Sequence, residues 1–383
     1  MILVYELLFW ICVSIILYTF VGYLLLLKIV SLFENFKKVK NINNRYSVTL
    51  LISAYNEEKV IEEKLINSLK LEYENLQIIV SSDGSSDQTI EKTSKYLSDK
   101  VKVLNYLEHR GKNSAINDSV SKIDTDLIIF SDADVLYKSD CIEKLVASFS
   151  NDVGCVVGEY KFLDSSTSPT SQGEGLYWKY EILLRKLEGN IGSLLVSSGS
   201  VCAIRRDLFS PLNTSGAADD MQIPIEILSK GYSVVYEEDA IAYLKTATDL
   251  KDEFRRKIRI INQGLYTFKV LKDKIKGFTL VQFISHKCLR WLLGIWAILL
   301  YLSNLLLLNK DITFNFYGLI FIMQNIFYLL AIIGYIIKNK KNVSKIFYIP
   351  FYFSMISITG IVALFQYFTG GRYVKWEKAE SAR

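Results

Sequence analysis

The sequence predicts an α/β domain that is flanked on both sides by transmembrane α-helices. Two observations lead to this fold class. Half of the 383 residues are hydrophobic, and they are concentrated near the two ends of the chain. Between these ends, short apolar runs alternate with stretches of helical periodicity, which is the pattern of parallel βαβ units in an open sheet.

The N-terminal apolar stretch is long enough to cross a membrane. Residues Ile2–Phe33 contain only two charged side chains, Glu6 and Lys28, and about 20 apolar residues suffice to span a bilayer. The shorter core, basic start and cleavage site of a signal peptide are not evident. A basic cluster follows the span, and by the positive-inside rule it places residue 46 onward in the cytoplasm. This cluster consists of Lys37, Lys38, Lys40 and Arg45.

Three further apolar runs lie near the C-terminus, at Lys287–Leu308, Asn315–Ile337 and Ile346–Thr369. The loop Lys338–Lys345 contains four lysines and is expected to be cytoplasmic. We therefore predict a multi-pass protein of the cell membrane, with one span before the α/β domain and three after it. Strict alternation of the spans would place the tail from Arg372 outside, although its basic residues favour the inside.

These patterns divide the chain into four parts. We expect an N-terminal transmembrane helix at 1–33, a cytosolic α/β domain at 46–278, a C-terminal membrane region with three transmembrane helices at 279–370, and a tail at 371–383.

The middle of the chain begins with a buried strand, Val48–Ser53, which is followed by Asn56 as a candidate helix N-cap. The apolar residues of the next segment then recur every four positions, as on one helical face. Further strands are expected at Leu76–Val80, Val101–Leu104 and Leu127–Phe130, with a helix at Lys112–Lys122. Because open parallel sheets bind ligands at the carboxyl ends of their strands, we expect the site there.

Charge and cysteine content exclude some classes of function. The net charge is +5, and the basic residues cluster beside apolar runs rather than along one stripe, so we expect no nucleic-acid partner. The five cysteines have no CxxC spacing. This indicates reduced thiols rather than a structural metal site or a disulfide framework.

Two acidic stretches follow expected strands. Asp132-Ala133-Asp134 comes directly after Leu127–Phe130, where two carboxylates can hold Mg²⁺ or Mn²⁺ against a diphosphate; the alternative is a solvated acidic turn. Asp83, in Ser-Asp-Gly-Ser-Ser-Asp, can accept hydrogen bonds from a base or ribose; the alternative is an Asx turn that starts the next helix.

Four other stretches have a functional and a structural interpretation. Arg110-Gly111-Lys112 precedes a helix and would face a phosphate or form a solvated loop, and we interpret the neighbouring His109 as incidental. Asp219 and Asp220 start a helix, either as a cap or with a general base that takes a proton from an acceptor hydroxyl. Ser198-Gly199-Ser200 could border the acceptor path or form a simple turn. Arg255–Arg259 could stabilise a leaving diphosphate or bind the membrane surface.

The order of these motifs resembles that of the family 2 glycosyltransferases with a GT-A fold. The resemblance is to the membrane-integrated branch, which includes hyaluronan, cellulose and poly-N-acetylglucosamine synthases, and it covers roughly residues 46–270. It is carried by Ser-Ala-Tyr-Asn-Glu at 53–57, Asp83, Arg-Gly-Lys at 110–112, Asp-Ala-Asp at 132–134, Ser-Gly-Ser at 198–200, Asp-Asp at 219–220 and Arg-Lys-Ile-Arg at 256–259.

The resemblance implies a role for each matching residue. Asp220 would be the catalytic base of an inverting single displacement, and Asp134 the main ligand of Mg²⁺ or Mn²⁺, with Asp132 beside it. Donor binding of a UDP-sugar would involve Ala54, Tyr55, Glu57, Asp83, Lys112, Asp132 and Ala133. The acceptor would be bordered by Ser198, Gly199, Ser200 and Asp219, and the diphosphate would face Arg256 and Arg259.

The sequence departs from the family pattern at a few positions. The family commonly has Pro at the place of Ser53, and Thr-Glu before the catalytic acid where this chain has Ala218-Asp219. Polymerising members carry Gln-x-x-Arg-Trp. The matching stretch here begins with Arg256 and ends with Arg259-Ile260, so the tryptophan is missing.

Three functions are compatible with these features. The first is a glycosyltransferase that extends a polysaccharide of the exopolysaccharide or capsule type at the cytoplasmic membrane face. The second is transfer of one sugar to a lipid carrier or lipid-linked acceptor, which the missing tryptophan favours. The third, a catalytically silent membrane scaffold or transporter subunit, is opposed by the retained acids at Asp83, Asp132, Asp134 and Asp220.

Overall fold

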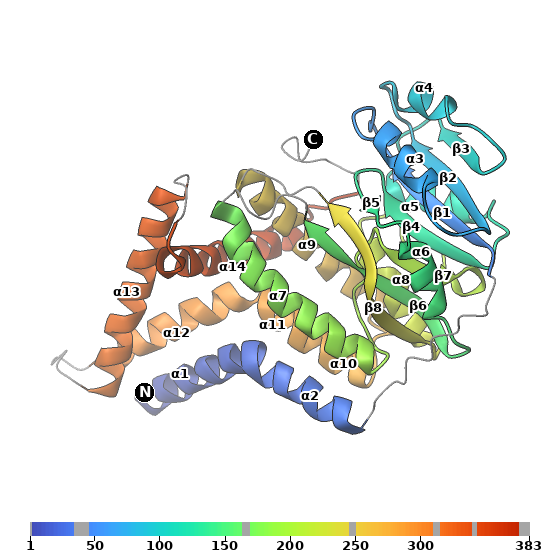
Figure 1. The fold of residues 1–383 in the computed structure, drawn as a ribbon. Coiled ribbons are helices and arrows are strands. Elements are labelled where there is room, and N and C mark those ends of the chain that lie inside the picture. Colours follow the sequence, from blue (N-terminus) through green and yellow to red (C-terminus); the bar gives the residue numbers. More distant parts are fainter. Residues whose placement is uncertain are drawn as a thin grey trace.

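The computed structural model describes residues 2–33, 46–162, 169–244, 250–308, 315–338 and 343–374. The α/β domain lies on one side of the molecule and most of the long helices lie on the other (Figure 1). Several segments used in the sequence argument lie outside the described residues. They are the basic cluster Lys37–Arg45, the loop 309–314, positions 339–342 of the lysine-rich loop, and the tail from 375.

Eight strands form one mixed sheet in the order β3-β2-β1-β4-β7-β6-β8-β5. The first half is parallel: β1 pairs with β2 on one side and β4 on the other, and β3 extends β2. In the second half, β7 runs antiparallel to β4 and β6, whereas β6 and β8 are parallel. The strands are β1 (Val48–Ala54), β2 (Leu76–Asp83), β3 (Val101–Tyr106), β4 (Leu127–Asp132), β5 (Leu136–Tyr137), β6 (Val153–Phe162), β7 (Cys202–Arg205) and β8 (Ser233–Leu244).

Helices cover both faces of the sheet, which explains why its central strand is apolar along its whole length. Every residue of β1 is buried. Leu50 packs in one core with α3 and α6, whereas Leu51 packs in the other core with α5 and α8. A strand with two buried faces reads as a continuous apolar run rather than an alternating one. These helices are α3 (Ile61–Leu69), α5 (Lys112–Val120), α6 (Cys141–Ala147) and α8 (Asp219–Ser229), and the short α4 (Thr89–Ser94) lies near β2 and β3.

The expected N-cap at Asn56 is wrong. The helix begins at Ile61, and its N-cap is Val60. Asn56 instead takes a positive φ of 53°, and its side-chain oxygen accepts a hydrogen bond from the backbone N–H of Ser86 at 2.8 Å. Asparagine tolerates this left-handed conformation better than most residues, so here it joins the loop after β1 to the loop after β2.

Three helices of the described chain are long and apolar enough to cross a membrane: Ile2–Phe33, Phe316–Ile337 and Lys345–Phe368. The first consists of α1 (Ile2–Leu17), the π-helical η1 (Tyr18–Gly22) and α2 (Tyr23–Phe33), and the other two are α13 and α14. The region of the expected span at Lys287–Leu308 belongs to a helix pair, Phe278–Trp291 and Leu293–Leu307, which is bent by 63°.

The bent pair contains four named segments. They are α10 (Phe278–Gln282), the π-helical η3 (Phe283–Cys288), α11 (Leu289–Trp291) and α12 (Leu293–Leu307). The bend separates a first part, which packs near the α/β domain, from α12, which packs against α1 and α14. Counted as one span, the pair would bring the total to four.

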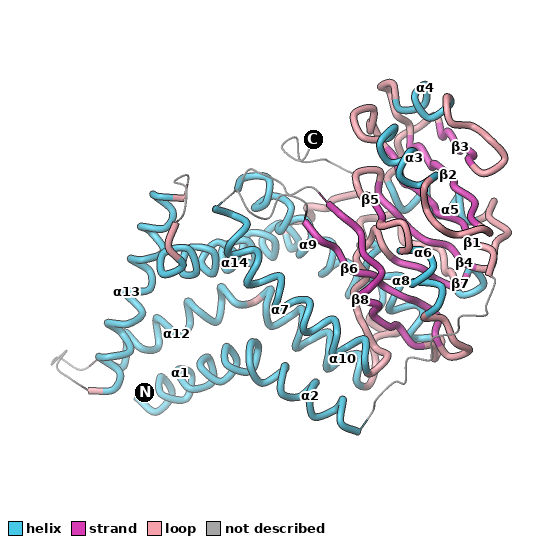
Figure 2. Tube along the Cα trace, viewed as in Figure 1, coloured by secondary structure: helices cyan, strands magenta, loops and turns pink. Residues whose placement is uncertain are grey.

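Two long helices join the sheet to the apolar helices. The helix α7 (Pro169–Asn190) packs against both β8 and α2, and α9 (Leu250–Leu271) packs against α8 and α14. Figure 2 shows the strands gathered in one body, with α7 crossing between them and the remaining helices. The site described below lies at this junction.

The chain returns to the α/β domain after α14. The side chain of Asn262 donates to the carbonyl of Gly371 at 3.1 Å, and that of Gln263 donates to the carbonyl of Tyr373 at 3.0 Å. The described residues of the tail therefore lie against α9. Their position differs from the outward placement that strict alternation of the spans would require.

Candidate active site

A cavity of about 540 Å³ lies where the sheet meets α7, α9 and the C-terminal helices. It brings together most of the residues that the sequence motifs singled out, although these residues are as much as 200 positions apart in the chain. Among its lining residues are Glu57, Lys112, Asp132, Asp134, Ser198, Gly199, Ser200, Asp219, Asp220, Arg256 and Arg259.

Lys112 joins the two acidic motifs at the centre of the cavity. Its ammonium lies 2.8 Å from the carboxylate of Asp132 and 3.0 Å from that of Asp219. Burial acts to lower the pKa of Lys112, but the two carboxylates outweigh it and raise the pKa. Ser200 donates a hydrogen bond to the other oxygen of Asp132. The end of β4, the start of α5 and the start of α8 are thus fixed to one another by charge.

Asp134 lies beside Asp132 with its charge incompletely neutralised. Burial, and then the charge of Asp132, raise its pKa to about 6. The nearby Lys64 is fully buried, where its ammonium donates to the hydroxyl of Ser131 at 2.8 Å. Burial lowers the pKa of Lys64 to about 7, against the opposing effect of Asp134. A cation that approached the two carboxylates would relieve their repulsion.

The residues present fit a divalent cation that shares its ligands with a substrate. No group of three or more His, Cys, Asp or Glu side chains that could hold a metal ion exists within the described residues. Mg²⁺ is typically bound by one or two carboxylates plus substrate phosphates. Asp132 and Asp134 supply this pair of hard oxygen ligands, and the cavity that they line leaves room for a diphosphate.

Asp220 is held in place through its backbone while its side chain lines the cavity. Its carbonyl accepts hydrogen bonds from the backbone N–H and the hydroxyl of Ser197, at 2.7 and 3.0 Å. Burial, and then the charge of Asp219, raise the pKa of its carboxyl to about 6. Gly199 has a φ of +70°, which lets the turn that follows Ser197 pass beside Asp220.

A second cluster, formed by Tyr55, Asp83 and His109, lies beside the cavity but does not line it. Asp83 accepts hydrogen bonds from the backbone N–H groups of Arg110 and Gly111 and lies 2.8 Å from Nδ1 of His109. The ring of His109 is stacked on that of Tyr55, with centroids 3.7 Å apart. The interpretation of His109 as incidental is therefore wrong, because it links two predicted donor-binding residues.

Of the remaining predicted residues, two alanines lie in the hydrophobic core and two arginines line the cavity. The side chains of Ala54 and Ala133 are 2% and 1% exposed and belong to the hydrophobic core, so only their backbone could face a ligand. Arg256 forms an ion pair with Glu253 at 2.7 Å. The pKa of Arg259 is lowered by burial, and then by Arg256. Both arginines line the cavity from α9.

The position of the missing family tryptophan is occupied by Ile260, which lines the cavity. A different tryptophan, Trp291, also lines it, from α11. An added Cβ on Gly264 would lie 2.5 Å from the ring of Trp291, so α9 and α11 pack with no space between them. Sequence reasoning could not find this residue, because it is 31 positions from the motif.

The family described as Glycosyl transferase family 2 matches residues 49–212, which run from β1 past β7 and include the cavity residues Glu57, Lys112, Asp132 and Asp134. This part of the chain is similar to a family 2 glycosyltransferase domain.

Two named proteins match a longer part of the chain. The chain is 23% identical, over 274 residues, to the poly-beta-1,6-N-acetyl-D-glucosamine synthase of Staphylococcus aureus strain COL, with 69% of this chain and 66% of the relative covered. It is 20% identical to the synthase of the same name from Staphylococcus epidermidis, with 70% and 67% covered. The chain thus spans slightly less than two thirds of the first of these relatives.

The complete fold also resembles a solved structure. A mannosyltransferase from Pyrobaculum calidifontis, solved in complex with GDP-Man and Mn²⁺, superposes with a TM-score of 0.72 at 18% sequence identity. The superposition covers 94% of this chain and 99% of the mannosyltransferase. The likeness shows that the GT-A fold and the flanking helices are shared.

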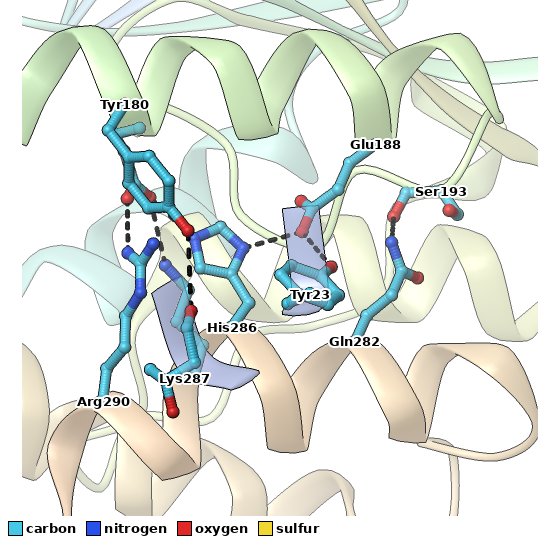
Figure 3. Close-up of polar contacts among 10 residues, drawn as sticks. Tyr23, Tyr180, Glu188, Ser193, Gln282, His286, Lys287 and Arg290 are labelled. Carbon is cyan, nitrogen blue, oxygen red and sulfur yellow. Dashed lines mark hydrogen bonds and ion pairs between the residues drawn. The ribbon is translucent and has the colours of Figure 1, made fainter. Parts of the chain in front are cut away.

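The end of the cavity that we call its inner end is built from α7, η3 and α11 (Figure 3). His286 lies between two carboxylates, with Nε2 at 2.9 Å from Glu181 and Nδ1 at 2.7 Å from Glu188. Arg290 donates to Glu181 at 2.7 Å, and Tyr23 of α2 donates to Glu188 at 2.6 Å. Three helices that are distant in sequence are joined by these contacts.

This cluster is a further feature that the sequence analysis missed. Burial acts to raise the pKa of Glu181, but His286, Lys287 and Arg290 outweigh it and hold the pKa well below its usual range. The sequence does contain one indication of this cluster. The spacing of Trp178, Glu181, Arg185 and Glu188 places one aromatic and three charged side chains on one face of a helix.

Proposed function

We propose that this glycosyltransferase moves a sugar from a nucleoside diphosphate sugar to a hydroxyl of a glycan at the membrane, with inversion at the anomeric carbon. The observation that carries the proposal is the presence of Asp220 and of the Asp132–Asp134 pair on the walls of one cavity. A candidate base and a candidate diphosphate site are thereby close enough to act on one donor and one acceptor.

Asp220 is proposed as the catalytic base. Its carboxylate takes the proton of the acceptor hydroxyl while the hydroxyl oxygen attacks the anomeric carbon, and the bond from that carbon to the diphosphate oxygen breaks. A raised pKa of about 6 leaves the carboxyl ionised at neutral pH but makes it a stronger base than an exposed aspartate. Lys112, Arg256 and Arg259 would stabilise the charge of the departing diphosphate.

The donor is proposed to bind across the two clusters. Tyr55, Glu57 and Asp83 would contact its base and ribose, together with the backbone of Ala54 and Ala133. We propose UDP as its nucleotide. We also propose an N-acetylhexosamine as its sugar, which the names of the Staphylococcus relatives support. Asp134, with Asp132, would hold Mg²⁺ or Mn²⁺, which when bound neutralises diphosphate charge.

The acceptor is proposed to lie along Ser198-Gly199-Ser200 and Asp219. A growing polysaccharide is the first candidate, because the similar proteins are named polysaccharide synthases. Transfer of one sugar to a lipid carrier or lipid-linked acceptor is the second. Two observations favour it: Ile260 stands where the polymerising members carry tryptophan, and α14 residues line the cavity, namely Tyr352, Ile356 and Thr359.

The protein is proposed to lie in the cell membrane as a multi-pass protein, with its catalytic domain, at about residues 46–278, in the cytoplasm. Support comes from the three apolar helices that are long enough to span a bilayer and from the basic residues that follow the first of them. The chain would then contact membrane lipid through α1, α13 and α14.

The test is a transfer assay that identifies donor and product together. Detergent-purified protein is incubated with Mn²⁺ or Mg²⁺, native membrane lipid and a panel of radiolabelled UDP- and GDP-sugars, and the labelled product is sized. A high-molecular-weight product from a UDP-sugar supports the polysaccharide candidate. A small, solvent-extractable product supports transfer to lipid.

The Asp220→Asn variant is the matched control for this assay, because it keeps the size of the side chain. Label incorporated by the lipid without added protein would come from another enzyme, whereas equal label with the variant would assign the base to another group. The absence of product with every donor, in a protein that is shown to be folded, would contradict the proposal and favour the silent scaffold.

A further inference from the structure

The inner end of the cavity carries cations that the proposed transfer does not use. Arg185, Lys287 and Arg290 line the cavity there, and the carboxylates that line the same end are Glu181 and Asp220. Arg290 is hydrogen-bonded to Glu181, and the third carboxylate of this cluster, Glu188, is bonded to His286 and Tyr23. Arg185 and Lys287 are the two cations of this end to which the proposed transfer gives no role.

Arg185 is the most unusual of these cations, because it is buried without a complete set of partners. Its side chain is 9% exposed, and its Nε has no hydrogen-bond partner in the part of the chain that the structure describes. The next residue, Lys186, differs: it points away and forms a surface ion pair with Glu238. Burying a charged donor without a partner is costly, so Arg185 is expected to have a ligand.

Contacts of Arg185 place it on the acceptor side of the cavity. Its guanidinium lies 5.4 Å from the ring centroid of Trp178, and that ring is 6.4 Å from the ring of Tyr160. The hydroxyl of Tyr160 in turn donates to the carbonyl of Ser198, in the turn proposed to border the acceptor. Arg185 and Lys287 also act electrostatically on the carboxyl of Asp220.

Lys287 lines the same cavity as Arg185 and is positioned by the cluster in Figure 3. The neighbouring residues His286 and Arg290 are fixed by hydrogen bonds to Glu181 and Glu188. The ammonium of Lys287 lies 3.6 Å from Glu181, which is longer than a hydrogen bond. It can therefore donate to an anion in the cavity while the helix that carries it stays in place.

Residues of α14 that line the cavity indicate what kind of molecule would carry an anion bound by these cations. Tyr352, Ile356 and Thr359 follow one face of α14 and line the cavity. This helix is one of those long and apolar enough to cross a membrane. The apolar part of a ligand would lie along this helix, with its polar end at the cations.

We infer that the inner end of the cavity binds the phosphate group of a lipid-linked acceptor, with Arg185 and Lys287 as its principal ligands. A phosphate offers several acceptor oxygens to the fixed fork of a guanidinium and to an ammonium. The acceptor hydroxyl would then lie at Asp220 while the lipid follows α14. This inference rests on the proposed assignment of Asp220 as the base, and it selects the lipid-linked acceptor.

The test measures binding of farnesyl phosphate and of farnesol, its uncharged counterpart, to the full chain in a non-ionic detergent. The expected result is that the wild-type protein binds farnesyl phosphate at least about tenfold more tightly than farnesol. Arg185→Gln should lose this preference, and Lys287→Gln should weaken it. Arg185→Lys should retain part of it, because the charge remains.

Lys186→Gln is the matched control, since it removes one positive charge from the adjacent position of the same helix. It should bind farnesyl phosphate like the wild type, which separates binding in the cavity from general attraction of this anion to a basic protein. Thermal unfolding of every variant shows whether a lost preference reflects a lost fold.

Several results would overturn the inference. They are equal affinity for farnesyl phosphate and farnesol, unchanged binding by a folded Arg185→Gln variant, binding of inorganic phosphate as tight as that of farnesyl phosphate, and displacement of farnesyl phosphate by UDP with Mn²⁺. The last would assign the cations to the donor diphosphate. Selective binding of farnesyl phosphate without transfer from any donor would instead contradict the proposed function alone.

Discussion

At the scale of single residues, the site contains pairs of buried carboxylates that repel one another when both are ionised. Asp134 and Asp220 each have a pKa raised to about 6, for the same two reasons: burial and an adjacent aspartate. Lys112 compensates one member of each pair, Asp132 and Asp219. Raised pKa values of this kind are typical of groups that bind cations or protons during a reaction.

Asp220→Asn is expected to abolish transfer while donor binding remains nearly unchanged. The amide cannot accept the proton of the acceptor hydroxyl, and loss of a general base typically costs about 10² to 10⁴ in rate. Steady-state transfer measures the loss of activity, and equilibrium binding of UDP with Mn²⁺ measures whether donor binding is unchanged. Turnover close to that of the wild type would show that another group is the base.

The raised pKa of Asp220 also predicts a pH profile. The base acts in its ionised form, so the transfer rate should rise with pH through about 6 and fall below it. Asp134 titrates in the same range. Donor binding must therefore be measured at each pH, because only a fall in rate at saturating donor reports on the base.

Asp134→Ala is expected to remove metal-dependent donor binding. The remaining carboxylate, Asp132, is paired with Lys112, so the diphosphate would lose its main cation bridge. Titration of UDP with and without Mn²⁺ measures this, with Asp99→Ala, an exposed loop position, as the control. Unchanged stimulation of binding by Mn²⁺ in the Asp134 variant would exclude the metal role.

At the scale of elements, glycines set how closely the apolar helices pack. An added Cβ on Gly294 of α12 would lie 2.3 Å from the carbonyl oxygen of Ser357 on α14, and one on Gly360 of α14 would lie 2.3 Å from the carbonyl oxygen of Trp291. Since α14 and Trp291 both line the cavity, these crossings also determine the shape of its inner end.

Gly294→Ala is expected to destabilise the protein by about 1–3 kcal/mol, because one extra carbon forces α12 and α14 apart. Thermal unfolding in detergent measures the loss. Ile298→Val, a one-carbon change on the half-exposed side of the same helix, should unfold close to the wild-type temperature. Equal stability of the two variants would mean that the crossing is more adaptable than its geometry indicates.

At the scale of the whole molecule, the catalytic cavity requires both the α/β domain and the helices that follow it. The cavity is lined by β-strand ends, by α7 and α9, and by residues of η3, α11 and α14. Neither part encloses the cavity alone. The described end of the tail, which lies against α9, also connects the last apolar helix directly to the domain.

The proposed orientation predicts which surfaces are accessible in intact cells. Lys95→Cys, on the exposed surface of the α/β domain, should react with a membrane-impermeant maleimide only after the cells are opened. Asp311→Cys, in the loop expected to face outward, should react in intact cells. Four of the five native cysteines are buried, so background labelling should be low. Labelling of Lys95→Cys in intact cells would reverse the orientation.

The sequence alone was sufficient for the features that depend on local pattern. Apolar runs at the two ends predicted the long helices, and alternating patterns predicted the strands up to β4, because burial on both faces requires continuous apolar residues. Motifs at strand ends predicted the cavity residues, since the ends of parallel strands meet at one edge of the sheet. Order along the chain, as in Asp83, Asp132 and Asp220, carried the resemblance.

The tertiary structure decided what depends on contacts between distant segments. His109 acquires its place from Tyr55 and Asp83, and Trp291 reaches the cavity only because the helix pair bends before α12. Glu181, on the charged face of α7, is paired in the structure with His286 and Lys287, which are distant in sequence. No local pattern records such pairings, because their energy comes from burying charges and rings against partners that folding alone brings together.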